Sequence, residues 1–119
     1  MELHETFPER HRRAMADPAD PIHNACDFFL PHSDEETLDL PGVNQWVHGE
    51  EFWAPWPSFL IAFASQGCGD YFAYDTRSTP SPVVYLGPDG EPEEELSADD
   101  ALRFDGFDAW YEYIIADRH

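Results

Sequence analysis

The chain has 119 residues, of which 25 are acidic and 6 are basic, so its formal net charge is −19. This balance argues against nucleic acid as a ligand, because neutralising phosphates requires a basic patch. Hydrophobic residues at 42% and aromatic residues at 15% are too many for a disordered chain, and the length suits a single domain over residues 1–119.

The chain carries no signal for a membrane. No apolar run approaches the roughly 20 residues needed to cross a bilayer, and the N-terminus is charged rather than apolar. We therefore expect a soluble, cytoplasmic protein. Cys26 and Cys68 lie far apart in the sequence, so a bridge is possible, but two free thiols are the expected state in that compartment.

The first 21 residues predict one helix and a connector. Pro8–Ala16 has strong helix formers after a proline, which suits a first helical turn because its missing N–H would be unsatisfied anyway. Asp17–Pro21 contains two prolines, and each pushes the preceding residue away from helical dihedrals. The basic run Arg10–Arg13 is short and should lie on the helix face rather than form a nucleic-acid patch.

Residues 22–57 predict a mixture of short elements. Ser33 with Glu36 fits a capping box at a helix start. Pro41-Gly42 is expected to end that element, after which Val43–Val47 alternates as a half-buried strand does. Residues 48–57 combine turn residues with aromatics and predict a loop that covers the edge of the core.

The centre of the chain predicts a meander of strands. Three apolar or aromatic segments are separated by turn residues: Ser58–Ser65, Asp70–Asp75 and Val83–Leu86. The first is either a buried strand or a short helix, because its apolar residues follow no single period. The other two have the β-branched and aromatic composition of strands, and Gln66–Gly69 makes a hairpin the simplest connection.

The C-terminal part predicts an amphipathic helix. Glu91–Glu95 is expected to be a solvated acidic loop. Beyond it, apolar residues recur at helical spacing: Phe107, Trp110, Tyr111, Ile114 and Ile115. A stripe of this kind should pack on the strands, so the sequence predicts an α+β domain.

An ordered set of motifs in the second half resembles the SUKH superfamily. The matching pieces are a strand at Phe59–Ala62, the pair Gly69-Asp70, an aromatic strand, the pair Pro82-Val83 and a helix start at Phe107–Trp110. Their order and spacing carry the resemblance, since each pair alone is common. The resemblance implies a mostly antiparallel sheet of about four to six strands packed against helices, with an amphipathic helix at the C-terminus.

The resemblance also implies binding rather than catalysis. The superfamily unites fungal cell-wall-synthesis regulators with bacterial immunity proteins. The leading expectation is an immunity protein that binds and neutralises a toxin, and the acidity of this chain favours a basic one. The alternative is a regulatory or scaffold domain for a cellular protein. Solubility alone would also explain the charge.

No catalytic, cofactor or metal site is predicted. The six histidines are scattered, and neither cysteine belongs to a CxxC pair. Asp70 and Asp75 could be read as a catalytic or metal pair, but strand alternation places them on opposite faces. We expect instead that Gly67 or Gly69 adopts positive φ and that Asp70 hydrogen-bonds the backbone of its own turn.

One segment is a candidate surface for a protein partner. Its residues are Trp46, Glu50, Glu51, Trp53 and Trp56. At least half of the aromatic residues in this segment are expected to fill the core, which leaves one or two exposed. An exposed indole beside carboxylates would suit a binding hot spot that engages Arg or Lys of a partner.

Overall fold

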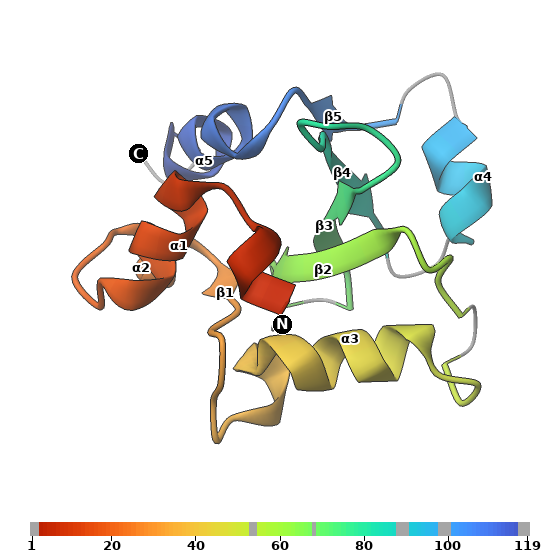
Figure 1. Ribbon diagram of the computed structural model, residues 1–119, viewed down its shortest axis with the longest axis horizontal. Coiled ribbons are helices and arrows are strands. Elements are labelled where there is room, and N and C mark those ends of the chain that lie inside the picture. The colour runs from red at the N-terminus through yellow and green to blue at the C-terminus, as the bar shows by residue number, and fades with distance from the viewer. Residues whose placement is uncertain (1–2, 53–54, 68, 88–90, 98–100, 117–119) are drawn as a thin grey trace.

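The computed structural model describes residues 3–52, 55–67, 69–87, 91–97 and 101–116. Its strands are β1 (Asp27–Phe28), β2 (Leu60–Ser65), β3 (Tyr71–Asp75), β4 (Val83–Leu86) and β5 (Arg103–Phe104). They form one sheet in the order β1-β2-β3-β4-β5, in which every neighbouring pair is antiparallel. The expected antiparallel α+β fold is therefore confirmed (Figure 1).

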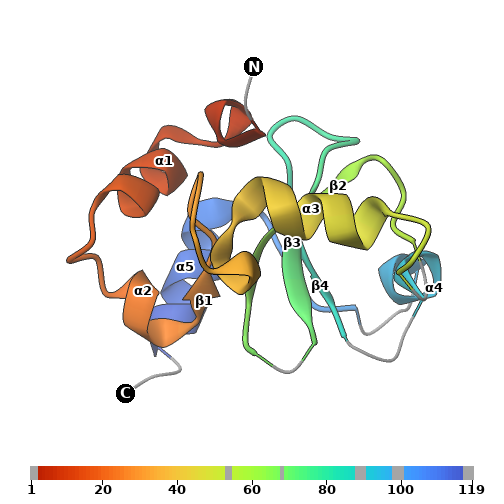
Figure 2. The same cartoon turned by 90° about the horizontal axis from the view of Figure 1, so that it is seen from below.

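Helices cover both faces of this sheet. They are η1 (Leu3–Thr6), α1 (Glu9–Ala16), α2 (Ile22–Ala25), η2 (Glu36–Leu38), α3 (Leu40–His48), α4 (Pro92–Ser97) and α5 (Phe107–Ala116). The group α1, α2 and α5 lies on one side, and α3 crosses the other side against β2 (Figures 1 and 2). Because both faces are covered, β2 and β3 are buried along nearly their whole length.

The predicted C-terminal helix packs on the sheet as expected. Trp110 of α5 is fully buried, and its ring lies 4.8 Å from that of Phe63 in β2 and 5.5 Å from that of Phe72 in β3. Phe107 and Ile114, one turn to either side, are buried as well. No helix among the described residues is long and apolar enough to span a membrane.

Helix α3 occupies residues for which the sequence predicted something else: the end of an element at Pro41-Gly42 and a strand at Val43–Val47. Asp39, rather than the predicted capping box, caps this helix: its Oδ2 accepts from the backbone N–H of Gly42 at 3.0 Å. Ser33 instead accepts from the N–H of Glu35 through its Oγ and closes a local turn. Pro41 fits the first helical turn because no donor is needed there. The predictions of a capping box at Ser33 and of a strand at Val43–Val47 are therefore wrong.

A buried asparagine joins α3 to the sheet. Asn44 donates from Nδ2 to the carbonyl oxygen of Ala62 at 2.9 Å and accepts from the N–H of Ala62 at 2.8 Å. The amide thereby pairs with β2 as the backbone of another strand would. Its Nδ2 also donates to the carbonyl of Leu40 at 2.9 Å, so the side chain satisfies backbone groups of both elements.

Other expectations have mixed outcomes. Residues 60–65 form a strand rather than a helix, and α1 begins one residue after Pro8.

The prediction of an acidic loop at Glu91–Glu95 is wrong, because α4 begins at Pro92. The carboxylate of Glu95 accepts from the N–H of Gly87 at 2.8 Å. The short strand β5 was not predicted. The thiol prediction stays open, because Cys68 lies outside the described residues.

Candidate partner-binding groove

A groove of about 760 Å³ opens beside the first part of α3. On one side it is lined by η2 and α3, and on the other by β1 and the turn that joins β2 to β3. Figure 2 shows how α3 crosses the sheet. Segments about 40 residues apart in the chain therefore meet at one surface hollow.

Three aromatic residues contribute to the lining of the groove. Trp46 is 50% exposed although it belongs to α3, and its ring meets that of Phe52 edge-on at 5.7 Å. Tyr71 is half-buried and Phe29 is buried, and both contribute to the lining. An indole that leaves half of its surface in water can gain by burying that surface against a partner.

Three carboxylates border the same hollow. Asp39 is committed to its capping bonds with the N–H groups of Gly42 and Ser33. Asp27 and Glu36 are exposed, and neither forms an ion pair within the described ranges. The described lining contains no arginine or histidine, so the groove is negatively charged.

The turn that forms one wall is held by Asp70. Its Oδ1 accepts from the N–H of Gln66 at 3.1 Å and from the hydroxyl of Ser65 at 3.2 Å, and its carboxylate is fully buried. Gly67 and Gly69 have φ of 92° and 85°, a region that side chains with a Cβ rarely adopt. The expected positive φ is found at both glycines, and Asp70 accepts from the backbone of its own turn as expected.

The structure separates the five residues of the predicted partner surface. Trp46 lines the groove, whereas Glu50 and Glu51 are exposed beyond the end of α3 and do not line it. Trp56 is only 7% exposed and its ring lies 5.4 Å from that of Tyr71. The prediction of Trp56 as a partner-binding residue is wrong, because its ring belongs to the core. Trp53 lies outside the described residues.

Sequence reasoning missed Asp27, Glu36 and Tyr71. No local motif marks them as binding residues, since an isolated Asp, Glu or Tyr is common on any strand or turn. They become a site only because the sheet and η2 bring them to the same hollow as Trp46. A search for exposed aromatic side chains would have found Tyr113 of α5 as well as Trp46.

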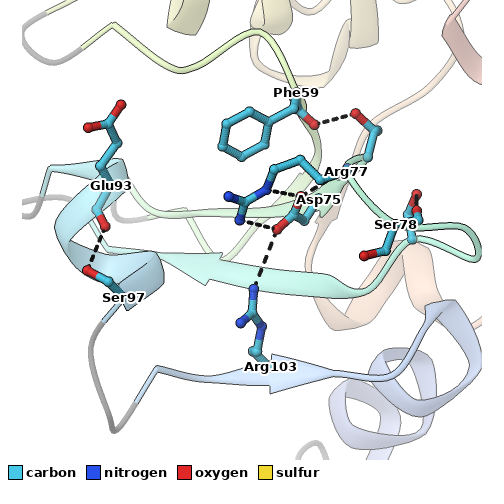
Figure 3. A network of polar contacts seen from close by, with 9 residues as sticks. Phe59, Asp75, Arg77, Ser78, Glu93, Ser97 and Arg103 are labelled. Atoms are coloured by element: carbon cyan, nitrogen blue, oxygen red, sulfur yellow. Dashed lines mark hydrogen bonds and ion pairs between the residues drawn. The ribbon is translucent and has the colours of Figure 1, made fainter.

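A second charged cluster has a structural role (Figure 3). Asp75 is 3% exposed and accepts from Arg77 through both carboxylate oxygens, at 3.0 and 2.7 Å. Arg103 of β5 approaches the same carboxylate at 3.5 Å, and the guanidinium of Arg77 lies 4.2 Å from the ring centroid of Phe59. The hydrogen bond from Arg77 lowers the pKa of Asp75 although burial opposes this. The cluster fastens β3 to β5.

The N-terminal arginines also serve the fold. Arg10 pairs with Asp108 of α5 at 3.0 Å and lies 4.6 Å from the ring centroid of Tyr111. Arg12 donates from Nε to the carbonyl of Phe7 at 3.1 Å. Arginines 10, 77 and 103 are thus neutralised by carboxylates of this chain. Most of the acidic residues have no such counterpart, because there are 25 of them and only 6 arginines.

Comparison with known proteins finds no match among family models, curated proteins or solved structures. Within the part of the chain that the structure describes, no three His, Cys, Asp or Glu side chains converge in a way that would hold a metal ion. The chemistry available in the groove is that of carboxylates beside an exposed indole, a combination that attracts cations.

Proposed function

We propose that this chain is a non-catalytic protein-binding domain, namely an immunity protein that binds and neutralises a basic toxin. The observation that carries the proposal is the groove, which is lined by an exposed indole and by the carboxylates of Asp27 and Glu36, neither of which pairs with a cation of the described residues. The order of the SUKH-like motifs supports it as well. The protein would act in the cytoplasm by covering a functional surface of the toxin.

The overall charge would speed such an encounter. A net charge of −19 attracts a cationic protein from a distance and raises the association rate toward it. Steered association reaches about 10⁸–10⁹ M⁻¹s⁻¹ at low salt and slows steeply as salt is added. A protective inhibitor also needs a dissociation constant of about 1 nM or less, which corresponds to a binding free energy of about −12 kcal/mol or lower.

The proposal is tested with the toxin-like reading frames that neighbour the gene. Each is expressed in bacteria with and without this chain, and survival is recorded. We expect rescue from one of them and nanomolar binding of the two purified proteins by calorimetry, with an association rate that falls as salt rises. If the chain rescues the cells from none of the neighbouring toxins, the proposal is overturned. Weak binding to several cellular proteins would favour a regulatory or scaffold domain instead.

A further inference from the structure

The chain contains two examples of how it holds a guanidinium group. Arg77 lies over the ring of Phe59 at 4.2 Å and hydrogen-bonds both oxygens of Asp75. Arg10 lies over the ring of Tyr111 at 4.6 Å and pairs with Asp108. In both cases one face of the guanidinium covers an aromatic ring while its edge meets a carboxylate, which uses the two interactions that suit this planar cation.

The groove offers the same pair of chemical groups without an arginine. The ring is that of Trp46, which is 50% exposed, and the carboxylates are those of Asp27 and Glu36. The described lining supplies no arginine to them. Trp46 is also the strongest ring for this purpose, because indole attracts cations better than the rings of Phe or Tyr do.

We infer that the groove receives an arginine side chain from a basic loop of a protein partner. The inference rests on the proposed function, because it names the chemistry by which the partner is recognised. Arginine is favoured over lysine, since the flat guanidinium can stack on the indole while its edge donates to a carboxylate. A lysine ammonium is compact and strongly hydrated, so it gains less from the ring.

The probe is a blocked tripeptide, acetyl-Gly-Arg-Gly-amide, added to the full ¹⁵N-labelled chain. Its matched control carries citrulline, which has the shape of arginine without the charge. We expect the arginine peptide to shift the indole N–H signal of Trp46 and the amide signals of Glu36 and Gly67 saturably. The citrulline peptide should bind at least about tenfold more weakly, and the lysine peptide also more weakly than arginine. Equal affinity for arginine and either control overturns the inference.

Three variants locate the binding. Trp46→Ala and Glu36→Gln should each weaken the arginine peptide by roughly five- to tenfold, because each removes one of the two interactions. Glu112→Gln removes an exposed carboxylate from α5, away from the groove, and should leave binding unchanged. All three positions are exposed, so the fold should persist, as the amide spectrum verifies. Equal losses in Glu36→Gln and Glu112→Gln would mean general charge attraction and would overturn the inference.

The two proposals fail separately. If the toxin is neutralised by the Trp46→Ala variant as well as by the original chain, the groove is not where it binds, and only the present inference fails. If the arginine peptide binds at the groove but no neighbouring toxin is neutralised, the proposed function fails and the cation site remains. A parallel loss of toxin affinity and peptide affinity in Trp46→Ala supports both.

Discussion

His11 should make the stability of this protein fall in mild acid. The imidazole is fully buried between two parallel rings, 4.4 Å from that of Phe7 and 4.5 Å from that of Phe107. Its Nδ1 lies 2.7 Å from the hydroxyl of Tyr74, and its Nε2 has no hydrogen-bond partner among the described residues. The ring of Phe63 closes a third side at 4.9 Å. Burial therefore lowers the pKa of His11 well below its ordinary value.

The direction of the effect follows from the pH at which His11 takes up a proton in the unfolded and in the folded chain. The unfolded chain takes up a proton at His11 near pH 6.5, whereas the folded chain does so only at a lower pH. The stability that the neutral, buried imidazole of His11 allows is fully present above about pH 6.5. It is lost as the pH falls toward the lowered pKa of His11 in the folded chain. Inside that window the loss approaches about 1.4 kcal/mol per pH unit, so a fall from pH 7 to pH 5 costs at most about 2 kcal/mol. Tyr74 does not offset this, because burial raises its pKa and keeps it neutral.

Urea unfolding at pH 7 and at pH 5 measures the effect. The His11→Leu variant is the comparison, because leucine cannot titrate while the carboxylates remain the same in both proteins. The original chain should lose more stability than the variant between the two pH values, by up to about 2 kcal/mol. A direct second measurement follows the ring signals of His11 by NMR, which should still be those of a neutral imidazole as the pH passes below 6.5. Identical pH dependence in the two proteins, or titration near pH 6.5, would refute the reasoning.

Three further substitutions test the contacts that build the fold, each by urea unfolding at pH 7. Asn44→Asp replaces a donor to Ala62 with an acceptor and should cost about 2–4 kcal/mol; a loss below 1 kcal/mol would mean that the helix does not depend on this link. Asp75→Asn should cost about 1–3 kcal/mol at pH 7 by weakening the pairing with Arg77. Because this pairing lowers the pKa of Asp75, the difference in unfolding free energy between the two proteins should shrink as the pH falls through the lowered pKa. Asp39→Ala removes the cap of α3 and should cost about 1 kcal/mol, whereas an unchanged midpoint would contradict the assigned cap.

Local patterns were sufficient for the elements that contain their own signals. The stripe from Phe107 to Ile115 predicted a helix because its spacing repeats over more than two turns. The glycines of the turn predicted positive φ at Gly67 or Gly69, because few other residues adopt it, and both have it. Asp70 predicted a hydrogen-bonded turn because its short side chain reaches neighbouring N–H groups. In each case the energetic reason lies within a few residues of the chain.

The groove and the helix beside it were decided by distant contacts. In α3 the apolar positions Leu40, Val43 and Val47 are too few to reveal their period. Asn44 can be buried there because the backbone of Ala62, 18 residues away, both accepts from and donates to its amide. The sequence by itself determined the charge, the α+β class and the aromatic content of the segment near Trp46. Which tryptophan fills the core and which faces water depended on the packing of α3 against the sheet, because burial is a property of two surfaces and a sequence segment contains only one of them.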